Sequence, residues 1–556
     1  MLRTAVLLGL LAAMPVWGAT ARGTVFEDLN ANGVLDEGEP GIAKVRVSNG
    51  HDVVLTDSAG EYALRLPAET IIFITKPAGY RTPVNGRQLP QFYYIHQPDG
   101  SPGGLRYQGI APTGPLPEAV NFPLQASEEP SVFDAILFAD TQPQTEAELD
   151  YIRDDVVAEL IGTDARFGMT LGDITFDDMS MFPRINSIIA QIGIPWYNVP
   201  GNHELNLLAE GDRYSLETFK RVFGPPYYAF EYGDAVFFVL DNIYYNGGGE
   251  VTADNFRGNG GYVAKFDDDQ LRWIKNELEH VPNDKLVFLA MHSPLETYLG
   301  DAPGVTTQNR RDLFRMLSGR EHLYAVAGHT HTTEHRYFDA DDGFNGPRPF
   351  HHHVLATVSG SWWGGPFDTR GIPTTDQRDG TPNGYHVLEV DGVDMTVRFK
   401  AAGQPEDFQM RIVFDVHHGG GRVDGMRDFR PGELLDGRMN VDQVPAAAVY
   451  VNLFDGGPNS TVEFSIGGGE VIEMRRVLLI DPWINEVLIR NPDTKKTWVQ
   501  PQASSHLWTA DLPDTLGPGV YTLSVRAIDE FGREHHAHRV VEIEGSPASP
   551  TQPHRY

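Results

Sequence analysis

Hydrophobic positions change their spacing twice along the chain, and each change marks a different kind of fold. Between about residues 23 and 125, short apolar runs are separated by Gly, Asp and Asn, which is the pattern of strands joined by turns. The strands that we expect are GTVF, AKVRVSN, VVLTD, GEYALRL and TIIFITK. A stretch rich in Pro and Gly and an acidic linker at 127–130 follow. We therefore predict an N-terminal β-domain over residues 22–126.

Apolar strands alternate with amphipathic helices from residue 127 to about residue 403. The strands that we expect are FDAILFA, FGMTL, WYNVP, AVFFVL, KLVFLAM, LYAVAG and HVLATVS. Helical spacing over 145–160 is carried by Leu149, Ile152, Val156, Val157 and Leu160. The same spacing recurs over 182–192 and 271–278. Buried strands that alternate with helices predict an α/β layered domain over residues 127–403.

The pattern of the remaining chain is that of strands again. The strands that we expect are AVYVNLF, TVEFSI, LWTADL, GVYTLSVRAID and HRVVEIE. They predict a C-terminal β-sandwich over residues 404–545. Residues 546–556 are rich in Pro and Ser, and we expect a disordered tail there.

The N-terminus has the pattern of an export signal. Arg3 is followed by the apolar run AVLLGLLAAMPVW and then by the small residues Ala19 and Ala21 around Thr20. We predict a signal peptide over residues 1–21, hence a secreted or periplasmic protein; the alternative is a buried N-terminal helix. No later stretch is apolar for long enough to span a membrane.

Composition narrows the classes of function. The chain has 556 residues, a formal net charge of −32 and no Cys. Such an acidic protein is not expected to bind a nucleic-acid duplex, which requires a basic surface. Any site for an anionic phosphate therefore needs local positive charge, and metal ions are the most direct source. Disulfides and thiolate metal sites are excluded, because both require Cys.

Polar side chains with metal-binding chemistry follow five of the expected strands. They are Asp140, Gln142, Asp173, Asn202, His203, Glu204, His292, His329 and His331. Loops at the carboxyl ends of parallel strands meet at one edge of a sheet, so we expect these side chains to converge. Oxygen and imidazole ligands suit Mn, Fe, Zn or Mg. Two such cations can clamp a displacement at phosphorus and acidify a bound water that acts as the nucleophile, with Asp173 as the expected bridging ligand.

These residues resemble the calcineurin-like metallophosphoesterase family, with its ordered pieces D-x-H, GD, GNH[D/E], a lone His and GHxH. The resemblance implies a four-layer α/β sandwich, flanked by the N- and C-terminal β-domains of one bacterial branch. It implies that one metal is held by Asp140, Gln142, Asp173 and His331, and the other by Asp173, Asn202, His292 and His329. His203 would act on the leaving-group oxygen, and Asp177 or Glu204 would orient neighbouring groups.

Two positions depart from the family pattern. Most members have His where this chain has Gln142, and an amide oxygen binds Zn less tightly than imidazole does. We therefore expect the first site to prefer a harder ion such as Mn²⁺ or Mg²⁺. The segment GDITFD has one additional residue before Asp177, which makes its role less certain than that of Asp173.

A second metal-binding pattern lies near the N-terminus. Side chains at alternating positions and one backbone carbonyl fit a calcium loop with Gly33 at its turn: Asp28, Asn30, Asn32, Val34, Asp36 and Glu39. Strands rather than helices are expected on both sides, so a structural Ca²⁺ in a β-domain is predicted. The alternative is a polar turn without metal.

Several further residues have two open interpretations. Trp362 and Trp363 either pack or form a wall for a substrate group. Arg213 and Arg257 are candidate phosphate contacts. Residues 246–261 form a lid or an ordinary surface loop. We expect His351, His352 and His353 at a strand edge, and structural roles for His335 and His386.

The sequence thus predicts an enzyme that hydrolyses phosphate mono- or diesters at a dinuclear metal centre. One alternative is a calcium-dependent surface-binding protein with a degenerate catalytic domain. Gln142 supports this alternative, because most members of the family have His at that position. Another is a metal-dependent amidase or peptidase, although Asn202 would be an unusual ligand in such an enzyme. The sequence fixes neither the phosphate-ester substrate nor the oligomeric state.

Overall fold

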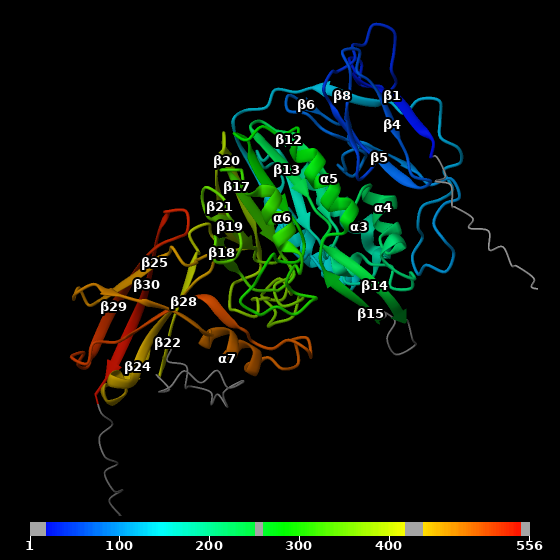
Figure 1. Cartoon of the computed structure of the whole chain (residues 1–556). Helices are drawn as coiled ribbons and strands as arrows, with labels where there is room; N and C mark the ends of the chain where they lie inside the picture. The colour runs from blue at the N-terminus through cyan, green and yellow to red at the C-terminus, as the bar shows by residue number, and fades with distance from the viewer. Residues whose placement is uncertain (1–17, 251–258, 417–436, 546–556) are drawn as a thin grey trace, which may run out of the picture.

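The computed structural model describes residues 18–250, 259–416 and 437–545. Figure 1 shows an N-terminal unit and a C-terminal unit on opposite sides of a larger central unit. Most of the expected signal peptide, Arg257 and the tail 546–556 lie outside the described residues. No helix in the described part of the chain is long and apolar enough to cross a membrane.

Two four-stranded sheets form the N-terminal unit, in the orders β4-β1-β8-β6 and β3-β2-β5-β7. Its strands are β1 (Thr20–Glu27), β2 (Arg46–Ser48), β3 (Val53–Leu55), β4 (Glu61–Arg65), β5 (Thr70–Thr75), β6 (Tyr80–Arg81), β7 (Tyr93–His96) and β8 (Phe122–Ala126). Strand β4 alternates exposed and buried residues, so its buried side chains Tyr62 and Leu64 face the core.

The central unit contains a five-stranded sheet, β11-β10-β9-β20-β21, and a six-stranded sheet, β12-β13-β16-β17-β19-β18. The first is built from β9 (Val132–Phe138), β10 (Phe167–Leu171), β11 (Trp196–Val199), β20 (Gly384–Asp391) and β21 (Asp394–Ala401). The second is built from β12 (Tyr228–Tyr232), β13 (Ala235–Val239), β16 (Leu286–Ala290), β17 (Leu323–Ala327), β18 (Glu334–Phe338) and β19 (Phe350–Val354). A separate hairpin joins β14 (Ile243–Glu250) to β15 (Asn259–Ala264).

Helices cover the outer face of each central sheet. They are α1 (Glu146–Tyr151), α2 (Ala158–Leu160), α3 (Phe182–Ile189), α4 (Glu217–Phe223), α5 (Asp268–Leu278) and α6 (Arg310–Leu317). Ile152 and Phe182 pack with Phe138 of the five-stranded sheet. Trp273 of α5 packs against Phe238 of the six-stranded sheet. The predicted four-layer α/β sandwich is therefore confirmed.

The helix expected over 145–160 differs from the expectation in one detail. Its middle, Ile152–Val157, is π-helical and joins α1 to α2. Thr145 caps the N-terminus of α1, because its side chain accepts a hydrogen bond from the backbone N–H of Glu148. The apolar face predicted from the sequence remains buried along the whole segment.

The C-terminal unit is a sandwich of the sheets β22-β24-β28-β27 and β23-β30-β29-β25-β26. Its elements are β22 (Met410–Val416), β23 (Arg438–Asn440), β24 (Ala447–Leu453), β25 (Thr461–Ile466), β26 (Ile472–Glu473), β27 (Arg475–Ile480), α7 (Pro482–Arg490), β28 (Ala503–Asp511), β29 (Gly519–Ile528) and β30 (Glu534–Glu544). Helix α7 was not expected from the sequence. Asp481 caps it and Pro482 starts its first turn.

Candidate metal centre

The loops that follow β9, β10, β11, β16 and β17 carry all seven expected metal ligands. Strands β9, β10 and β11 are mutually parallel, and so are β16 and β17, so the loops leave each sheet at one edge. Five of the seven expected ligands have left-handed backbones, with φ from 36° to 75°: Asp140, Gln142, Asp173, His329 and His331. This conformation is costly for residues other than Gly, and its concentration at these positions is typical of a functional site.

Glycines next to the ligands allow the close approach of neighbouring loops. A Cβ atom on Gly201 would lie 2.3 Å from Oδ1 of Asp173. A Cβ atom on Gly328 would lie 2.2 Å from Oδ2 of Asp140. Both distances are too short for any side chain, so the glycines of GNHE and GHTH are required by the packing of the ligands themselves.

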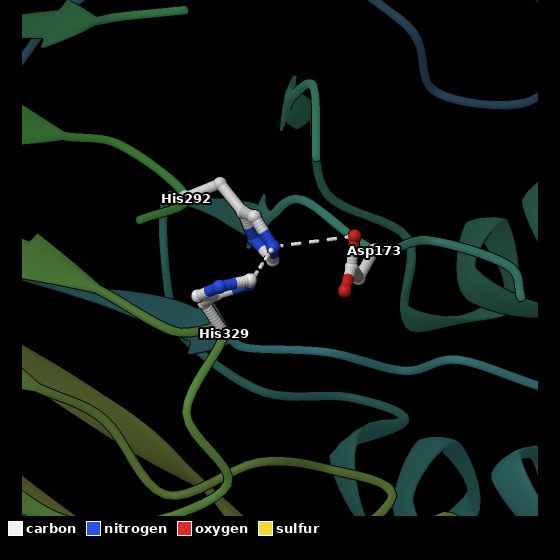
Figure 2. Close-up of side chains that lie close together, drawn as sticks. All are labelled: Asp173, His292 and His329. Carbon is white, nitrogen blue, oxygen red and sulfur yellow. Dashed lines mark hydrogen bonds and ion pairs between the residues drawn. The ribbon is translucent and has the colours of Figure 1, made fainter. Parts of the chain in front are cut away.

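One half of the centre gathers Asp173, Asn202, His292 and His329. Nε2 of His292 lies 3.2 Å from Oδ1 of Asp173, 3.1 Å from Oδ1 of Asn202 and 3.1 Å from Nδ1 of His329. Figure 2 shows the two imidazoles and the carboxylate facing one another. The Nδ1 atom of His292 lies 2.8 Å from the Leu171 carbonyl, a contact that orients Nε2 toward the other expected ligands.

The other half contains Asp140, Gln142 and His331. The Gln142 amide nitrogen donates a 2.6 Å hydrogen bond to Oδ2 of Asp173. Nε2 of His331 lies 3.7 Å from Oδ1 of Asp140, and Nδ1 of His331 lies 2.5 Å from the Gly360 carbonyl. Two buried acceptors, Oε1 of Gln142 and Nε2 of His331, have no hydrogen-bond partner. Unpaired buried acceptors are costly, and a bound cation would satisfy both.

The charges of these buried groups depend on one another. Burial lowers the pKa of His329 and of His331 to about 3, so both imidazoles are neutral and can act as ligands. Burial would raise the pKa of Asp173, but His292 and His203 hold it below its usual range. Burial raises the pKa of Asp140 to about 7. Such a group of carboxylates and imidazoles is suited to binding a divalent cation.

His203 lies beside the centre without entering either ligand set. Its Nδ1 atom is 2.7 Å from Oδ1 of Asp177, and its Nε2 atom is 3.8 Å from Oδ2 of Asp173. The ring stacks on Phe176, with 4.2 Å between the ring centroids. Burial would lower the pKa of His203, but Asp173 and Asp177 raise it to about 10. The additional residue before Asp177 thus does not prevent contact with His203.

Glu204 supports the backbone of the GNHE loop. Its carboxylate accepts hydrogen bonds from the N–H groups of Gly201, at 2.9 Å, and Thr175, at 3.2 Å. The first bond closes the loop after β11 on itself, and the second joins that loop to the loop after β10. Glu204 therefore orients the segments that carry Asn202 and Asp173.

Aromatic side chains from three segments line the same region. The ring of Trp362 stacks on His331 with 3.7 Å between centroids, and Trp498 lies 6.3 Å from Trp362 and 6.0 Å from Phe176. Trp498 belongs to the C-terminal unit and is 46% exposed. Trp363, in contrast, is 3% exposed and donates its indole N–H to the Thr141 carbonyl, so it packs behind the loop of Gln142.

Sequence reasoning did not single out Phe176 or Trp498. Phe176 lies between the expected ligand Asp173 and Asp177, which is a local signal that could have identified it. Trp498 lies far along the chain in a segment without a motif, and only the docking of the C-terminal unit brings it here. The contact between Nζ of Lys496 and Glu148, at 2.7 Å, is part of that docking.

The other candidate residues lie elsewhere. The Arg213 guanidinium pairs with Glu69 of the N-terminal unit at 2.8 Å and lies over the ring of Tyr214. Arg257 is outside the described residues, as are all of residues 251–258 of the expected lid; the remainder of 246–261 belongs to the hairpin β14–β15. His351, His352 and His353 lie in strand β19.

The expected calcium loop is held by its own side chains. The backbone N–H groups of Asn32 and Gly33 donate to the Asp28 carboxylate, at 3.1 and 2.9 Å. Asn30 and Asn32 each donate a side-chain hydrogen bond of 2.8 Å to Oδ2 of Asp36. Glu39 closes the loop, because it accepts hydrogen bonds from the N–H groups of Leu29 and Asp36. The Val34 N–H donates to Oδ1 of Asn32 at 2.7 Å.

Comparisons with known proteins agree with this architecture. Residues 136–333 match the family described as Calcineurin-like phosphoesterase. Residues 29–108 match the N terminal of Calcineurin-like phosphoesterase, and residues 352–535 match the C terminal of Calcineurin-like phosphoesterase. No curated protein matches the chain.

Two solved structures align with parts of the chain. A purple acid phosphatase from yellow lupin (Lupinus luteus) seeds is 14% identical, with a TM-score of 0.35, over 65% of this chain and 67% of its own. CopC from Methylosinus trichosporium is 14% identical, with a TM-score of 0.12, over 18% of this chain and 79% of its own.

The three family matches cover the N-terminal, central and C-terminal units in order. The chain therefore belongs to the calcineurin-like phosphoesterase family, as its motifs predict. It is a metal-dependent hydrolase that acts on phosphate ester bonds.

Proposed function

We propose that the chain hydrolyses phosphate mono- or diesters at a dinuclear centre in which Asp173 is shared by both metals. One observation carries this proposal: the two oxygens of Asp173 face different ligand sets. Oδ1 lies against His292 at 3.2 Å, and Oδ2 lies against Gln142 at 2.6 Å. A carboxylate with this placement is suited to bridge two cations.

Two divalent cations, when bound, would supply an acidified water and neutralise the phosphoryl oxygens. The residues present fit such ions, because imidazole, amide and carboxylate donors converge from five loops. Asp140, Gln142, Asp173 and His331 would hold the first ion, and Asp173, Asn202, His292 and His329 the second. Mn, Fe, Zn and Mg all suit this donor set.

His203 is proposed to donate a proton to the oxygen of the leaving group. Its Nδ1 atom is held by Asp177, and its ring is fixed in plane against Phe176. This arrangement leaves Nε2, on the side of Asp173, as the atom that transfers the proton. A positioned acid of this kind typically contributes about 10²–10⁴-fold to the rate.

The aromatic side chains beside the centre indicate the kind of group that the ester carries. Phe176, Trp362 and the exposed Trp498 present flat apolar faces close to His203 and His331. We propose that they contact a ring of the substrate, either a sugar or an aromatic group, through stacking.

A substrate screen tests the proposed function. The purified chain is assayed with Mn²⁺, Mg²⁺ or Zn²⁺ on p-nitrophenyl phosphate and bis-p-nitrophenyl phosphate, then on sugar phosphates and nucleotides. We expect metal-dependent turnover that Asp173→Ala abolishes and His203→Ala reduces. Absence of turnover with every metal would instead support a surface-binding protein with a degenerate catalytic domain.

Calcium binding by the loop 28–39 is a separate proposal. Asp28, Asp36 and Glu39 supply carboxylates within one short loop, and Asn30 and Asn32 supply amide oxygens. We expect Ca²⁺ to raise the melting temperature of the chain and Asp28→Asn to weaken that effect. An unchanged melting temperature at saturating Ca²⁺ would contradict the proposal.

Export is also proposed, because residues 1–21 carry the charge, apolar run and small residues of a signal peptide. Fractionation of producing cells, followed by N-terminal sequencing, tests it. We expect the mature chain to begin near Arg22 outside the cytoplasm; an uncleaved cytoplasmic chain would contradict the proposal.

A further inference from the structure

A second cluster of imidazoles lies where the two central sheets meet the C-terminal sandwich. His335 of β18 and His353 of β19 are direct cross-strand partners. His386 comes from β20 of the other sheet, and Asp455 follows β24 of the C-terminal unit. None of these residues has been given a role in phosphate-ester hydrolysis.

The nitrogens of these imidazoles converge on one carboxylate oxygen. Oδ1 of Asp455 lies 3.4 Å from Nε2 of His335, 2.8 Å from Nε2 of His353 and 3.4 Å from Nε2 of His386. The three imidazoles are fully buried, and the Asp455 side chain is 9% exposed. One ligand atom from each of His335, His353 and Asp455 lies within 4.8 Å of the other two, so these three residues are close enough to share an ion such as Zn²⁺.

Hydrogen bonding alone does not account for the cluster. The Asp455 carboxylate is hydrogen-bonded to His353, but Nε2 of His335 and both ring nitrogens of His386 are buried without a hydrogen-bond partner. Unpaired buried polar atoms destabilise the folded state. A cation shared with His353 and Asp455 would satisfy Nε2 of His335.

The outward nitrogens of two of the rings are held in place. Nδ1 of His353 lies 2.9 Å from the Tyr324 hydroxyl, and Nδ1 of His335 lies 2.9 Å from Nε2 of His351. Metal-binding histidines characteristically have such partners, because a contact on one ring nitrogen orients the other toward the metal.

We propose that His335, His353 and Asp455 bind a structural Zn²⁺ that joins the central unit to the C-terminal sandwich, with His386 beside the Asp455 carboxylate. Imidazole and carboxylate donors suit Zn²⁺ in a chain without thiolates. All three residues are buried, so the ion would be closed to a substrate, as in a structural site. Because Asp455 is the ligand from the C-terminal unit, the ion would help to keep that unit, and with it Trp498, docked. The proposal does not depend on the catalytic metals.

Metal analysis of the full chain tests the site. Wild type and the double variant Asp455→Asn/His353→Asn are saturated with Zn²⁺, freed of excess metal and measured by inductively coupled plasma mass spectrometry. We expect the double variant to contain one equivalent less per chain. His536→Asn is the control, because this His is 55% exposed and distant from the cluster in sequence, and it should match wild type.

Cobalt gives a second measurement on the same proteins. The difference spectrum between Co²⁺-loaded wild type and the double variant should show the intense visible bands of tetrahedral Co²⁺. Equal metal content in the two folded proteins, without such bands, would overturn the proposal. If the double variant does not fold, anomalous diffraction is measured from wild-type crystals at the Zn edge. A peak among His335, His353 and Asp455 supports the site, and its absence overturns the proposal.

Discussion

The Nδ1 atom of His203 lies 2.7 Å from Oδ1 of Asp177, and this contact fixes the imidazole beside the candidate metal centre. The ring cannot tilt freely, because Phe176 stacks on its face. Asp177 therefore orients His203, and its effect on catalysis should be exerted through that ring.

His203→Ala should slow the hydrolysis of poor leaving groups most. An alkyl phosphate ester needs a proton on its departing oxygen, so we expect kcat to fall by roughly 10²–10⁴-fold. p-Nitrophenolate leaves without a proton, so its ester should lose much less. Asp177→Asn should give a smaller loss with the same preference. Steady-state kinetics on both esters measure this, and an equal loss for both would show that His203 is not the acid.

Gly328→Ala should impair the centre although position 328 supplies no ligand. The new Cβ would lie 2.2 Å from Oδ2 of Asp140, so the Asp140 carboxylate must move. We expect loss of metal from the first site and at least a tenfold drop in kcat/KM. Gly319→Ala is the control, because its Cβ would meet no atom within 4 Å. Retention of metal and activity by Gly328→Ala would contradict the packing described here.

Trp498→Ala should weaken substrate binding without unfolding the chain. Aromatic pairs contribute about 0.5–1.5 kcal/mol, so KM for a ring-bearing ester should rise about 2–10-fold. The melting temperature should change little, because the side chain is 46% exposed. Phe367→Ala, at a residue that is 59% exposed, is the matched control. An unchanged KM for every ring-bearing ester would remove Trp498 from the substrate site.

Gln142→His should change the metal preference of the first site. Imidazole binds Zn²⁺ more tightly than an amide oxygen does, so we expect higher Zn²⁺ occupancy in the variant than in wild type. Wild type should instead respond best to Mn²⁺ or Mg²⁺. Metal analysis after equilibration with mixed ions measures the preference. Stoichiometric Zn²⁺ at both sites of the native wild type would refute it.

The sequence could predict the layered fold because its signals are local. Buried strands such as FGMTL and amphipathic helices such as 182–192 are each defined by neighbouring residues. The candidate ligands could be proposed for the same reason, since Asp173 and His292 directly follow apolar strands whose ends must share an edge. Helix α7 was missed because it is short and lies among strands.

Features that depend on tertiary packing could not be predicted in this way. Trp498 reaches the candidate centre only because the C-terminal unit docks beside Trp362. His335, His386 and Asp455 come from two sheets and a separate sandwich, and no spacing rule links them. The sequence therefore indicated structural histidines without revealing the carboxylate that they share.

Anomalous diffraction from crystals grown with Mn²⁺ tests most directly the claim that Asp173 is shared by two cations. The account predicts two peaks about 3.5–4 Å apart, one near Oδ1 and one near Oδ2 of Asp173. A single peak, or two peaks that do not have this carboxylate between them, would contradict it.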